Sequence, residues 1–194
     1  MREKLVEGFR KGIVVPQGLI AHGRGEAFDY LLGEKTTKYA YDAEKAAVCL
    51  LLLSNESIIS INGNTAALCA RDLVILSNHT KSGIEVNLFH KSTARSNAIA
   101  KILRKEEATE VLGLNTKLKS VIKGISSNRR YVDKNGIMKS DTIFVALEDG
   151  DRTESLVKMG KKVISVDLNP LSRTAMTSDV TIVDNIVRAI PNMI

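Results

Sequence analysis

The sequence predicts an α/β fold: a mostly parallel, six-stranded sheet with helices on both faces, preceded by an N-terminal helical segment. Three observations predict it. Short β-branched stretches alternate with stretches of helical period, which is the pattern of strand–helix–strand crossovers. Two of the expected strands, at 143–147 and 163–166, are almost continuously apolar, as strands buried on both faces are. The 194 residues, 44% apolar and 26% charged, are typical of one globular domain.

The first 54 residues are expected to be helical. Apolar residues recur at helical spacing in Arg2–Lys11 and in the short stretch Gly25–Leu32. Thr37–Leu53 becomes apolar all round towards its end, as a buried helix does. We therefore expect a single domain, with a helical segment over 1–54 and an α/β core over 55–194.

From residue 55 onward, the period alternates between that of strands and that of helices. Strands are expected at 57–62, 84–89, 110–113, 142–147, 162–166 and 180–183. Helices are expected at 65–77, 92–105, 152–159 and 172–177, and a final turn or helix at 185–189. Residues 114–140 are polar and carry no clear period, so we expect a long excursion of the kind that often serves binding.

The net charge of +6 is concentrated in one segment. Residues 91–141 hold 12 Lys or Arg against 5 Asp or Glu, so the rest of the chain is slightly acidic. A basic segment favours an anionic partner such as nucleic acid, phosphate esters or membrane headgroups. Its one aromatic residue, Tyr131, offers no platform on which bases could stack, and a plain solvated surface is an equally good interpretation.

The chain is expected to be cytoplasmic. Its longest apolar run, Ala46–Leu53, is far shorter than the roughly 20 residues that span a bilayer. The charged stretch Met1–Lys11 has no signal-peptide core. Cys49 and Cys69 each lie in an apolar stretch, so we expect two buried free thiols in a reducing compartment.

Polar residues follow five of the expected strands. In an open parallel sheet, ligands bind beyond the carboxyl ends of the strands, where such residues meet. The residues are Asn62–Asn64, Asn87 with His90 and Lys91, Glu148–Glu154, Asp167–Thr174, and Asp184 with Asn185. Asn, Asp and Gly are also the ordinary residues of turns, so each stretch alone indicates only a turn. Five together favour a ligand site.

Two of these turns carry more specific signals. Asp151 is placed to cap a helix whose first turn, with Arg152, favours an anion. Ser172 stands in the same relation to Arg173. Asp167 ends a strand at the position where α/β nucleotide binders often place an acid for ribose hydroxyls. Ordinary capping is the simpler interpretation of Asp151 and Ser172.

The familiar phosphate loops are absent, since the chain has neither G-x-G-x-x-G nor G-x-x-x-x-G-K-S/T. The glycine-rich stretch 21–26 is expected to open a helix, where backbone amides and Arg24 could hold a phosphate; a tight turn is the alternative. His22 is equally open to a structural role. No histidine has the spacing of a zinc site, so no metal ligand is assigned, and no Ser-His-Asp or Cys-His arrangement is signalled.

Six longer runs recur together in one known family. The first is GLIAHGRGEAFDYLLGEKT over 18–36. The others are INGN over 61–64, EVNLF over 85–89, LEDGDRTE over 147–154, DLNPLSRT over 167–174 and IVDN over 182–185. In these runs the chain resembles the archaeal phosphopantothenate synthetases, which are 4-phosphopantoate–β-alanine ligases. The resemblance extends from Arg2 to Pro191 in the same order, which is far more specific than a short motif.

The resemblance implies a Rossmann-like fold and a homodimer. It also implies that ATP, 4-phosphopantoate and β-alanine are converted to 4′-phosphopantothenate, AMP and diphosphate in coenzyme A biosynthesis, with Mg²⁺ accompanying ATP. Neither a nucleic acid nor a membrane is then expected as a partner. The ATP contacts that it implies are Arg2, Arg24, Asp167, Leu168, Asn169, Arg173, Thr174, Asn185 and Ile186.

The chemistry adds candidates for the catalytic site. Joining a carboxylate to an amine through AMP release is expected to pass through an acyl adenylate, and the site must hold several phosphate groups. The candidates are His22, Arg24, Arg95 and Arg152 for phosphate groups, and Asp149 or Asp151 for a metal ion or the amine. We identify no general base.

The chain departs from the family pattern in three places. KSTAR at 91–95 replaces a run of the Arg-Thr-Glu-Glu-Arg type and keeps Arg95 but loses the acids. Residues 114–131 match poorly, and some members continue with extra helices beyond the position of Pro191. The competing hypothesis is a non-catalytic nucleotide- or nucleic-acid-binding protein that uses the basic segment 91–141.

Overall fold

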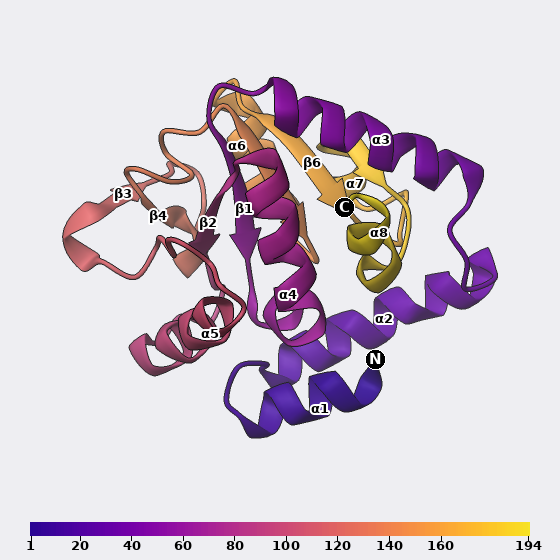
Figure 1. The fold of residues 1–194 in the computed structure, drawn as a ribbon, viewed down its shortest axis with the longest axis horizontal. Helices are drawn as coiled ribbons and strands as arrows, with labels where there is room; N and C mark the ends of the chain where they lie inside the picture. Colours follow the sequence, from indigo (N-terminus) through magenta and orange to yellow (C-terminus); the bar gives the residue numbers. More distant parts are fainter.

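Five parallel strands form the central sheet of the computed structural model, which describes residues 1–194 apart from the side chain of Thr116 (Figure 1). The strands are β1 (Ser57–Ile61), β2 (Gly83–Val86), β5 (Thr142–Ala146), β6 (Lys162–Val166) and β7 (Val180–Ile182). They pair in the order β2-β1-β5-β6-β7. Counted along the chain, this is the order 2-1-3-4-5, one of the two common doubly wound arrangements. The expected α/β class is therefore confirmed, and the strand order reverses between β1 and β5.

The three N-terminal helices confirm the expected helical segment. They are α1 (Arg2–Arg10), α2 (Pro16–Leu32) and α3 (Lys38–Leu53). The start expected for the second helix is wrong, because α2 begins at Pro16 and not at Gly25. A proline at the first helical position loses no helical hydrogen bond and has its φ already set, so it starts a helix well. Among the described residues, no helix is long and apolar enough to cross a membrane.

The two faces of the sheet have separate hydrophobic cores, because successive residues of a strand point to opposite sides. The covering helices are α4 (Gly63–Thr80), α5 (Thr93–Lys105), α6 (Gly150–Lys158), α7 (Arg173–Thr177) and α8 (Ile186–Asn192). Ile59 and Phe144 belong to a core shared with α1, α3, α4, α5 and α8. Ile143 and Val163 belong to a second core with Leu156 of α6. Figure 1 shows α4 and α6 on opposite sides of the sheet.

The excursion 114–140 contains regular structure that its sequence does not reveal. It holds β3 (Lys119–Val121) and β4 (Tyr131–Asp133), which pair antiparallel, and the 3₁₀ turns Thr116–Leu118 and Asn128–Arg130. Strands of three residues are too short to show an alternating pattern. Ile122, Val132 and Ile137 of the excursion are buried in the second core. The excursion therefore covers one face of the sheet.

The strand expected at 110–113 is wrong. Leu112 forms only an isolated bridge to Glu85 at the edge of β2. The chain then turns at Gly113, whose φ is 83°. A Cβ atom at this position would lie 2.5 Å from the carbonyl oxygen of Val86, so only glycine allows the approach. The main sheet accordingly has five strands rather than six.

Buried polar side chains tie the excursion to β2. The Glu85 carboxylate is completely buried and accepts backbone N–H groups of Asp133 at 3.0 Å and Ile137 at 2.7 Å. Burial raises the pKa of Glu85 to about 7. Just beyond β2, the Asn87 amide donates to the carbonyl oxygens of Arg129 at 3.3 Å and Tyr131 at 3.0 Å. These contacts hold one end of the excursion beside the carboxyl edge of the sheet.

Both cysteines are free thiols, as expected. Cys69 is buried, and burial raises its pKa. The expectation that Cys49 is buried is wrong, because its side of α3 is exposed. Helical spacing turns Ala47 and Leu51 of α3 inward, and Cys49 falls between them on the outer side.

Candidate active site

A cleft of about 920 Å³ runs along the carboxyl edge of the sheet. Residues that follow all five strands line it, together with one side of α2. The expectation that these strand ends meet at one rim is confirmed. At this edge the strand order reverses between β1 and β5, which is where open α/β sheets leave room for ligands. The expected site residues that line the cleft are His22, Arg24, Arg95, Asp167, Leu168, Asn169, Arg173, Thr174, Asn185 and Ile186.

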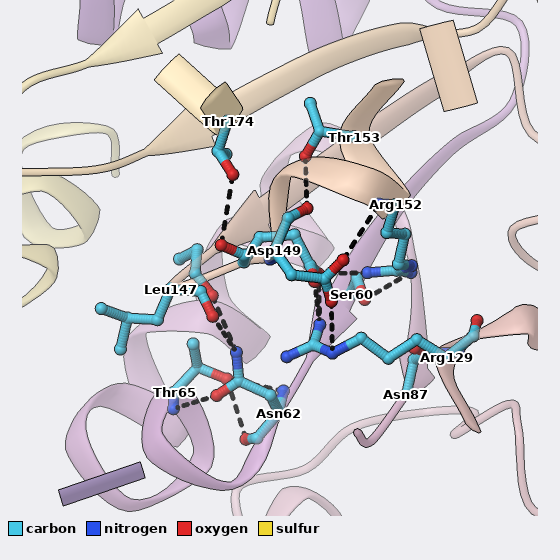
Figure 2. A network of polar contacts seen from close by, with 12 residues as sticks. Ser60, Asn62, Thr65, Asn87, Arg129, Leu147, Asp149, Arg152, Thr153 and Thr174 are labelled. Carbon is cyan, nitrogen blue, oxygen red and sulfur yellow. Dashed lines mark hydrogen bonds and ion pairs between the residues drawn. The ribbon is translucent and has the colours of Figure 1, made fainter. Parts of the chain in front are cut away.

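The end of β1 is joined to the end of β5 by Asn62. Its side-chain amide donates to the carbonyl oxygen of Ala146 at 2.7 Å, and its side-chain oxygen accepts the N–H groups of Asn64 and Thr65. Asn62 is therefore the N-cap of α4, and Thr65 completes a capping box. Figure 2 shows Asn62 joined to the end of β5 and to Thr65, and Asn62 lines the cleft at the reversal point.

The turn after β5 is capped by a different acid from the one expected. The Asp149 carboxylate accepts the Arg152 N–H at 3.0 Å and caps α6. Asp151, the expected cap, lies within the first turn instead. Leu147, directly after β5, has a φ of 54°, and α6 begins at Gly150, so the cap lies two positions earlier than the sequence indicates. Burial raises the pKa of Asp149.

Arg152 is completely buried and does not line the cleft. Its guanidinium pairs with Glu148 and donates to the Ser60 hydroxyl at 3.1 Å. Burial alone would raise the pKa of Glu148, but the charges of Arg129 and Arg152 hold it below its ordinary value. The expected contact of Arg152 with a substrate phosphate is thus wrong, because Arg152 forms a buried ion pair with Glu148 and is absent from the cleft lining; Figure 2 shows its contacts.

Two further expected residues lie outside the cleft lining. Arg2 is exposed on α1, where it donates to the Tyr30 hydroxyl and lies 3.8 Å from the Glu26 carboxylate. Asp151 is exposed and pairs with Arg173 at 2.7 Å. The structure therefore leaves Arg2 and Asp151 outside the cleft lining, although Asp151 contacts the candidate Arg173 at the surface.

The ends of β6 and β7 form the other half of the cleft. The Asp167 carboxylate accepts the Asn169 N–H at 2.9 Å and the Ser172 hydroxyl. Ser172 caps α7 by accepting the Ala175 N–H at 3.0 Å, so its expected capping role is confirmed. Asn185 caps α8 beside the same rim.

Helix α2 crosses the carboxyl edge of the sheet (Figure 1), and its residues between Gln17 and Phe28 line one side of the cleft. At one end the Asn64 amide donates to the Gly18 carbonyl oxygen at 2.8 Å. At the other end the Asp29 carboxylate accepts the Asn185 amide at 2.9 Å and the Arg188 guanidinium at 2.6 Å. The expected phosphate loop at 21–26 is therefore wrong, because its backbone amides lie inside a continuous helix and are used for helical hydrogen bonds.

His22 is a buried histidine whose two ring nitrogens have no hydrogen-bond partner in the structure. Its Nε2 atom lies 3.9 Å from the Glu26 carboxylate. Burial lowers the pKa of His22 despite that carboxylate, so the ring is neutral at pH 7. A neutral imidazole offers one donor and one acceptor, which suits a hydroxyl group as well as a phosphate oxygen.

Arg95 reaches the cleft from α5. Its guanidinium donates to the carbonyl oxygens of Ile13 at 2.6 Å and His90 at 2.8 Å. The space that it occupies exists because residue 63 is glycine, whose Cβ would lie 2.4 Å from an Arg95 nitrogen. Among the described residues, no carboxylate pairs with Arg95.

Sequence reasoning missed Arg129 and Glu148. Arg129 belongs to the excursion, lines the cleft and forms an ion pair with Glu148. The residues around Arg129 in the sequence indicate only a basic segment. Its position at the cleft depends on the hydrogen bond from Asn87, which is distant in sequence. Glu148 belongs to one of the polar stretches that follow the expected strands. Its two ion pairs with arginines were not predicted from the sequence.

Among the described residues, no group of three or more His, Cys, Asp or Glu side chains could hold a metal ion. The cleft is thus supplied chiefly with arginines, amides and single carboxylates. Such groups suit anionic ligands with hydroxyls.

Comparisons with known proteins agree with this chemistry. A family model described as "Phosphopantothenate/pantothenate synthetase" matches residues 39–194. The 4-phosphopantoate–beta-alanine ligase of Thermococcus onnurineus is 52% identical over 193 residues, which cover 99% of this chain and 73% of that protein. The 4-phosphopantoate–beta-alanine ligase of Thermococcus kodakarensis is 52% identical over 194 residues, which cover 100% of this chain and 74% of that protein. The ligase of Methanosarcina mazei is 50% identical over 192 residues, which cover 99% of this chain and 75% of that protein.

Proposed function

The chain belongs to the phosphopantothenate/pantothenate synthetase family, and from this premise we propose which part of its cleft handles each substrate. The protein is an ATP-dependent ligase that condenses 4-phosphopantoate with β-alanine to give 4′-phosphopantothenate in coenzyme A biosynthesis. One observation carries the proposal for the site. The cleft at the reversal of strand order gathers arginine, amide and carboxylate groups from five strand ends, where sheets of this kind bind ligands.

We assign ATP to the half of the cleft at β6 and β7. Asp167 is oriented by its bonds from Asn169 and Ser172 and is placed to accept ribose hydroxyls. Leu168, Asn169, Thr174, Asn185 and Ile186 border the same half, and Arg24 and Arg173 supply positive charge for phosphates. Arg2 joins them in this proposal by exchanging its surface contacts for the nucleotide.

We assign 4-phosphopantoate to the half at β1 and β2, where Arg95 lies. Its carboxylate then points towards the α-phosphate of ATP at the middle of the cleft. His22, neutral and without a partner, is available to a hydroxyl or phosphate oxygen of either substrate. Arg152 contributes indirectly by holding Glu148 in place.

The proposed reaction has two steps. A carboxylate oxygen of 4-phosphopantoate attacks the α-phosphorus of ATP, and diphosphate leaves, which gives an acyl adenylate. The neutral amine of β-alanine then attacks the acyl carbon, the carbon–oxygen bond to AMP breaks, and the amine's proton passes to solvent. The arginines stabilise the charge that develops on the phosphates, and a closed cleft protects the adenylate from water.

Mg²⁺ is expected to accompany the triphosphate. Mg²⁺ is commonly held by one or two carboxylates together with substrate phosphates rather than by a protein cage. The described residues offer no cluster of three ligands, so we derive no step through the ion. Of the four carboxylates that line the cleft, Glu148 pairs with two arginines and Asp184 pairs with Arg188, so Asp149 and Asp167 are the ones we propose to meet the ion.

A coupled assay for AMP tests the function. The purified protein should release AMP and diphosphate only when ATP, 4-phosphopantoate and β-alanine are all present. AMP release without β-alanine at the same rate would indicate simple hydrolysis. Salt-dependent retention on DNA or RNA without ligation would instead support the nucleic-acid alternative, which the family match does not favour.

Oxygen labelling tests the acyl adenylate. 4-Phosphopantoate labelled with ¹⁸O in its carboxylate should transfer one ¹⁸O atom to AMP, because the attacking oxygen stays on the α-phosphate. Appearance of the label in inorganic phosphate, together with ADP, would mean an acyl phosphate route. The chain has no P-loop lysine to support transfer of the γ-phosphate, which favours the adenylate.

We further propose that the ligase works as a homodimer in the cytoplasm, where ATP is available. Light scattering during size-exclusion chromatography measures the mass. A mass near twice 21.2 kDa supports the dimer, and a mass near 21.2 kDa contradicts it.

A further inference from the structure

Glu44 of α3 is a buried carboxyl group that does not line the cleft. Its Oε1 atom accepts the Asn192 amide at 3.3 Å, and its Oε2 atom has no hydrogen-bond partner among the described residues. An ionised carboxylate has room for about four hydrogen bonds, so an ionised group with a single partner is costly to bury. The burial of Glu44 therefore favours the neutral acid.

The buried charges around Glu44 are already negative in sum. Asp184, at the end of β7, and Arg188 of α8 are the charged groups that act on it. Arg188 is shared between Asp184 and Asp29 of α2, so two carboxylates face one guanidinium before Glu44 is counted. Among the described residues, no charged group of α3 or α4 acts on Glu44. Burial, together with the charge of Asp184, raises the pKa of Glu44 to about 7.

A chain of hydrogen bonds leads from Glu44 to the cleft. The Asn192 amide donates both to Glu44 and to the Thr36 hydroxyl at 3.3 Å, and the Thr36 hydroxyl donates to Asp184 at 2.6 Å. Because the proton of Thr36 is used on Asp184, Thr36 accepts from Asn192. This order fixes the Asn192 amide as the donor to Glu44, so the proton of the neutral acid lies on Oε2.

Asp184 is the point where this chain of hydrogen bonds reaches the cleft. Its carboxylate lines the cleft and accepts the Asn185 N–H at 2.7 Å and the Arg188 guanidinium at 2.9 Å. The side chains of Asn185 and Arg188 also donate to Asp29, which attaches α8 to α2. Figure 1 shows α8 between α2 and α3. The surroundings of Glu44 therefore bear on the half of the cleft that is assigned to ATP.

We propose that Glu44 is a positioning residue for ATP: its neutral form keeps the hydrogen bonds that hold Asp184 in place at the cleft, and its ionisation weakens ATP binding. The inference rests on the ATP site proposed above. Two physical effects act in the same direction. An uncompensated buried negative charge repels the triphosphate, and a carboxylate draws the Asn192 amide away from Thr36. Since linkage is reciprocal, bound ATP favours the protonated form of Glu44.

Glu44→Gln tests the proposal, because glutamine copies the shape of the neutral acid and cannot ionise. Calorimetry gives the Kd for ATP at pH 6, 7 and 8 in both proteins. The ratio of the wild-type Kd to that of the variant should be about 1 at pH 6 and about 5 at pH 8. This rise follows if the ionised form binds ATP about tenfold more weakly and Glu44 titrates near pH 7. Ionisation of ATP itself is common to both proteins and cancels in the ratio.

The matched control is Asp42→Asn, which removes a carboxylate from the exposed side of the same helix. Its Kd should follow that of the wild type at every pH. Asn192→Leu breaks the first link between Glu44 and the cleft, so the Kd should rise less between pH 6 and pH 8 than in the wild type. This variant decides the matter if Glu44→Gln does not fold, as circular dichroism would show.

Infrared spectroscopy adds a readout that a purely structural role does not move. The carbonyl stretch of a protonated carboxyl group should be present at pH 6, weaken by pH 8, and lose one component in Glu44→Gln. At pH 7, added ATP should strengthen that component in the wild type.

Two results would overturn the proposal. A ratio near 1 from pH 6 to pH 8 would show that ATP binding does not depend on the ionisation of Glu44. Weaker binding in Glu44→Gln by the same factor at every pH would make Glu44 a structural residue only. Absence of ATP binding by the wild type at every pH is distinguishable from both, because it would contradict the proposed function together with this inference.

Discussion

Arg152, which lies outside the cleft lining, is the single residue whose replacement we expect to affect stability most. Its completely buried guanidinium is shared between Glu148 and Ser60. Its removal leaves the buried Glu148 carboxylate paired with Arg129 alone. We expect Arg152→Met to lower the free energy of unfolding by about 3–5 kcal/mol, the usual cost of breaking a buried pair from one side. Urea denaturation measures the change, provided that the slope is unaltered.

Arg173→Met is the control for this effect. Arg173 also pairs with a carboxylate, that of Asp151, but both side chains are exposed. Its removal should leave the denaturation midpoint unchanged, because exposed ion pairs contribute little. A loss below about 1 kcal/mol in Arg152→Met would contradict the structural role assigned to the buried pair.

Asp167 is the residue whose replacement should separate the two substrates. Asp167→Asn keeps a hydrogen-bonding group for Asn169 but removes the charge that is proposed to meet the ribose. We expect the KM for ATP to rise by about tenfold or more, with little change in the KM for 4-phosphopantoate. Asp179→Asn is a suitable control, because Asp179 pairs with Lys162 at the opposite end of β6. Equal increases in both KM values would mean that Asp167 only shapes the turn.

At the scale of elements, α2 owes its place across the strand ends to polar contacts at its two ends. Arg188 of α8 joins Asp29 of α2 to Asp184 at the end of β7, at 2.6 Å and 2.9 Å. The Thr36 hydroxyl adds a bond to Asp184 at 2.6 Å. Since α2 carries Arg24, the position of a proposed ATP contact depends on a residue that is not itself proposed to touch ATP.

We expect Arg188→Met to raise the KM for ATP by about tenfold, which corresponds to about 1.4 kcal/mol, the order of one charged hydrogen bond. The KM for 4-phosphopantoate should change less, because the Asn64–Gly18 contact at the other end of α2 is intact. Arg188→Lys should restore part of the affinity. Lys162→Met, which breaks the ion pair at the far end of β6, should leave both KM values unaltered. Equal effects of Arg188→Met and Lys162→Met would contradict a specific role of the α2 attachment.

At the scale of the whole molecule, Glu85 joins the sheet to the excursion and makes stability depend on pH. Burial raises its pKa in the folded protein to about 7, above the unfolded value of 4.5. Between these values the folded state holds a proton that the unfolded state has lost, so the free energy of unfolding falls as pH rises through this window. The shift corresponds to a loss of about 3 kcal/mol between pH 4.5 and pH 8.

Unfolding by urea at several pH values between 5 and 8 measures this slope. Glu85→Gln should be less stable at pH 5, because one of the two backbone N–H groups loses its acceptor, and its slope over this range should be flatter. The same slope in the variant and the wild type would show that Glu85 is ionised in the folded protein throughout.

Local patterns were sufficient for the main elements of the fold. The strands at 142–147 and 162–166 and the helix after Ser172 follow from apolar runs and capping residues that act over a few positions. The two strand predictions are confirmed because a strand buried on both faces of a sheet must be apolar, however the strands are connected. The strand at 110–113 failed, because a single Gly113 contact with Val86, distant in sequence, decides where the chain leaves the sheet.

The sequence by itself determined the α/β class, the polar rim at the strand ends and, through six long runs, the family. Only the tertiary structure decided that α2 lines the cleft and that Asp149 rather than Asp151 caps α6. It also decided that Arg129 lines the cleft while Arg152 is completely buried outside the lining. The reason is physical: periodicity and capping depend on neighbours along the chain, whereas burial of a charged group depends on partners that only folding brings together. Arg129 and Glu148 are 19 residues apart in the chain, and Arg152 and Ser60 are 92 apart.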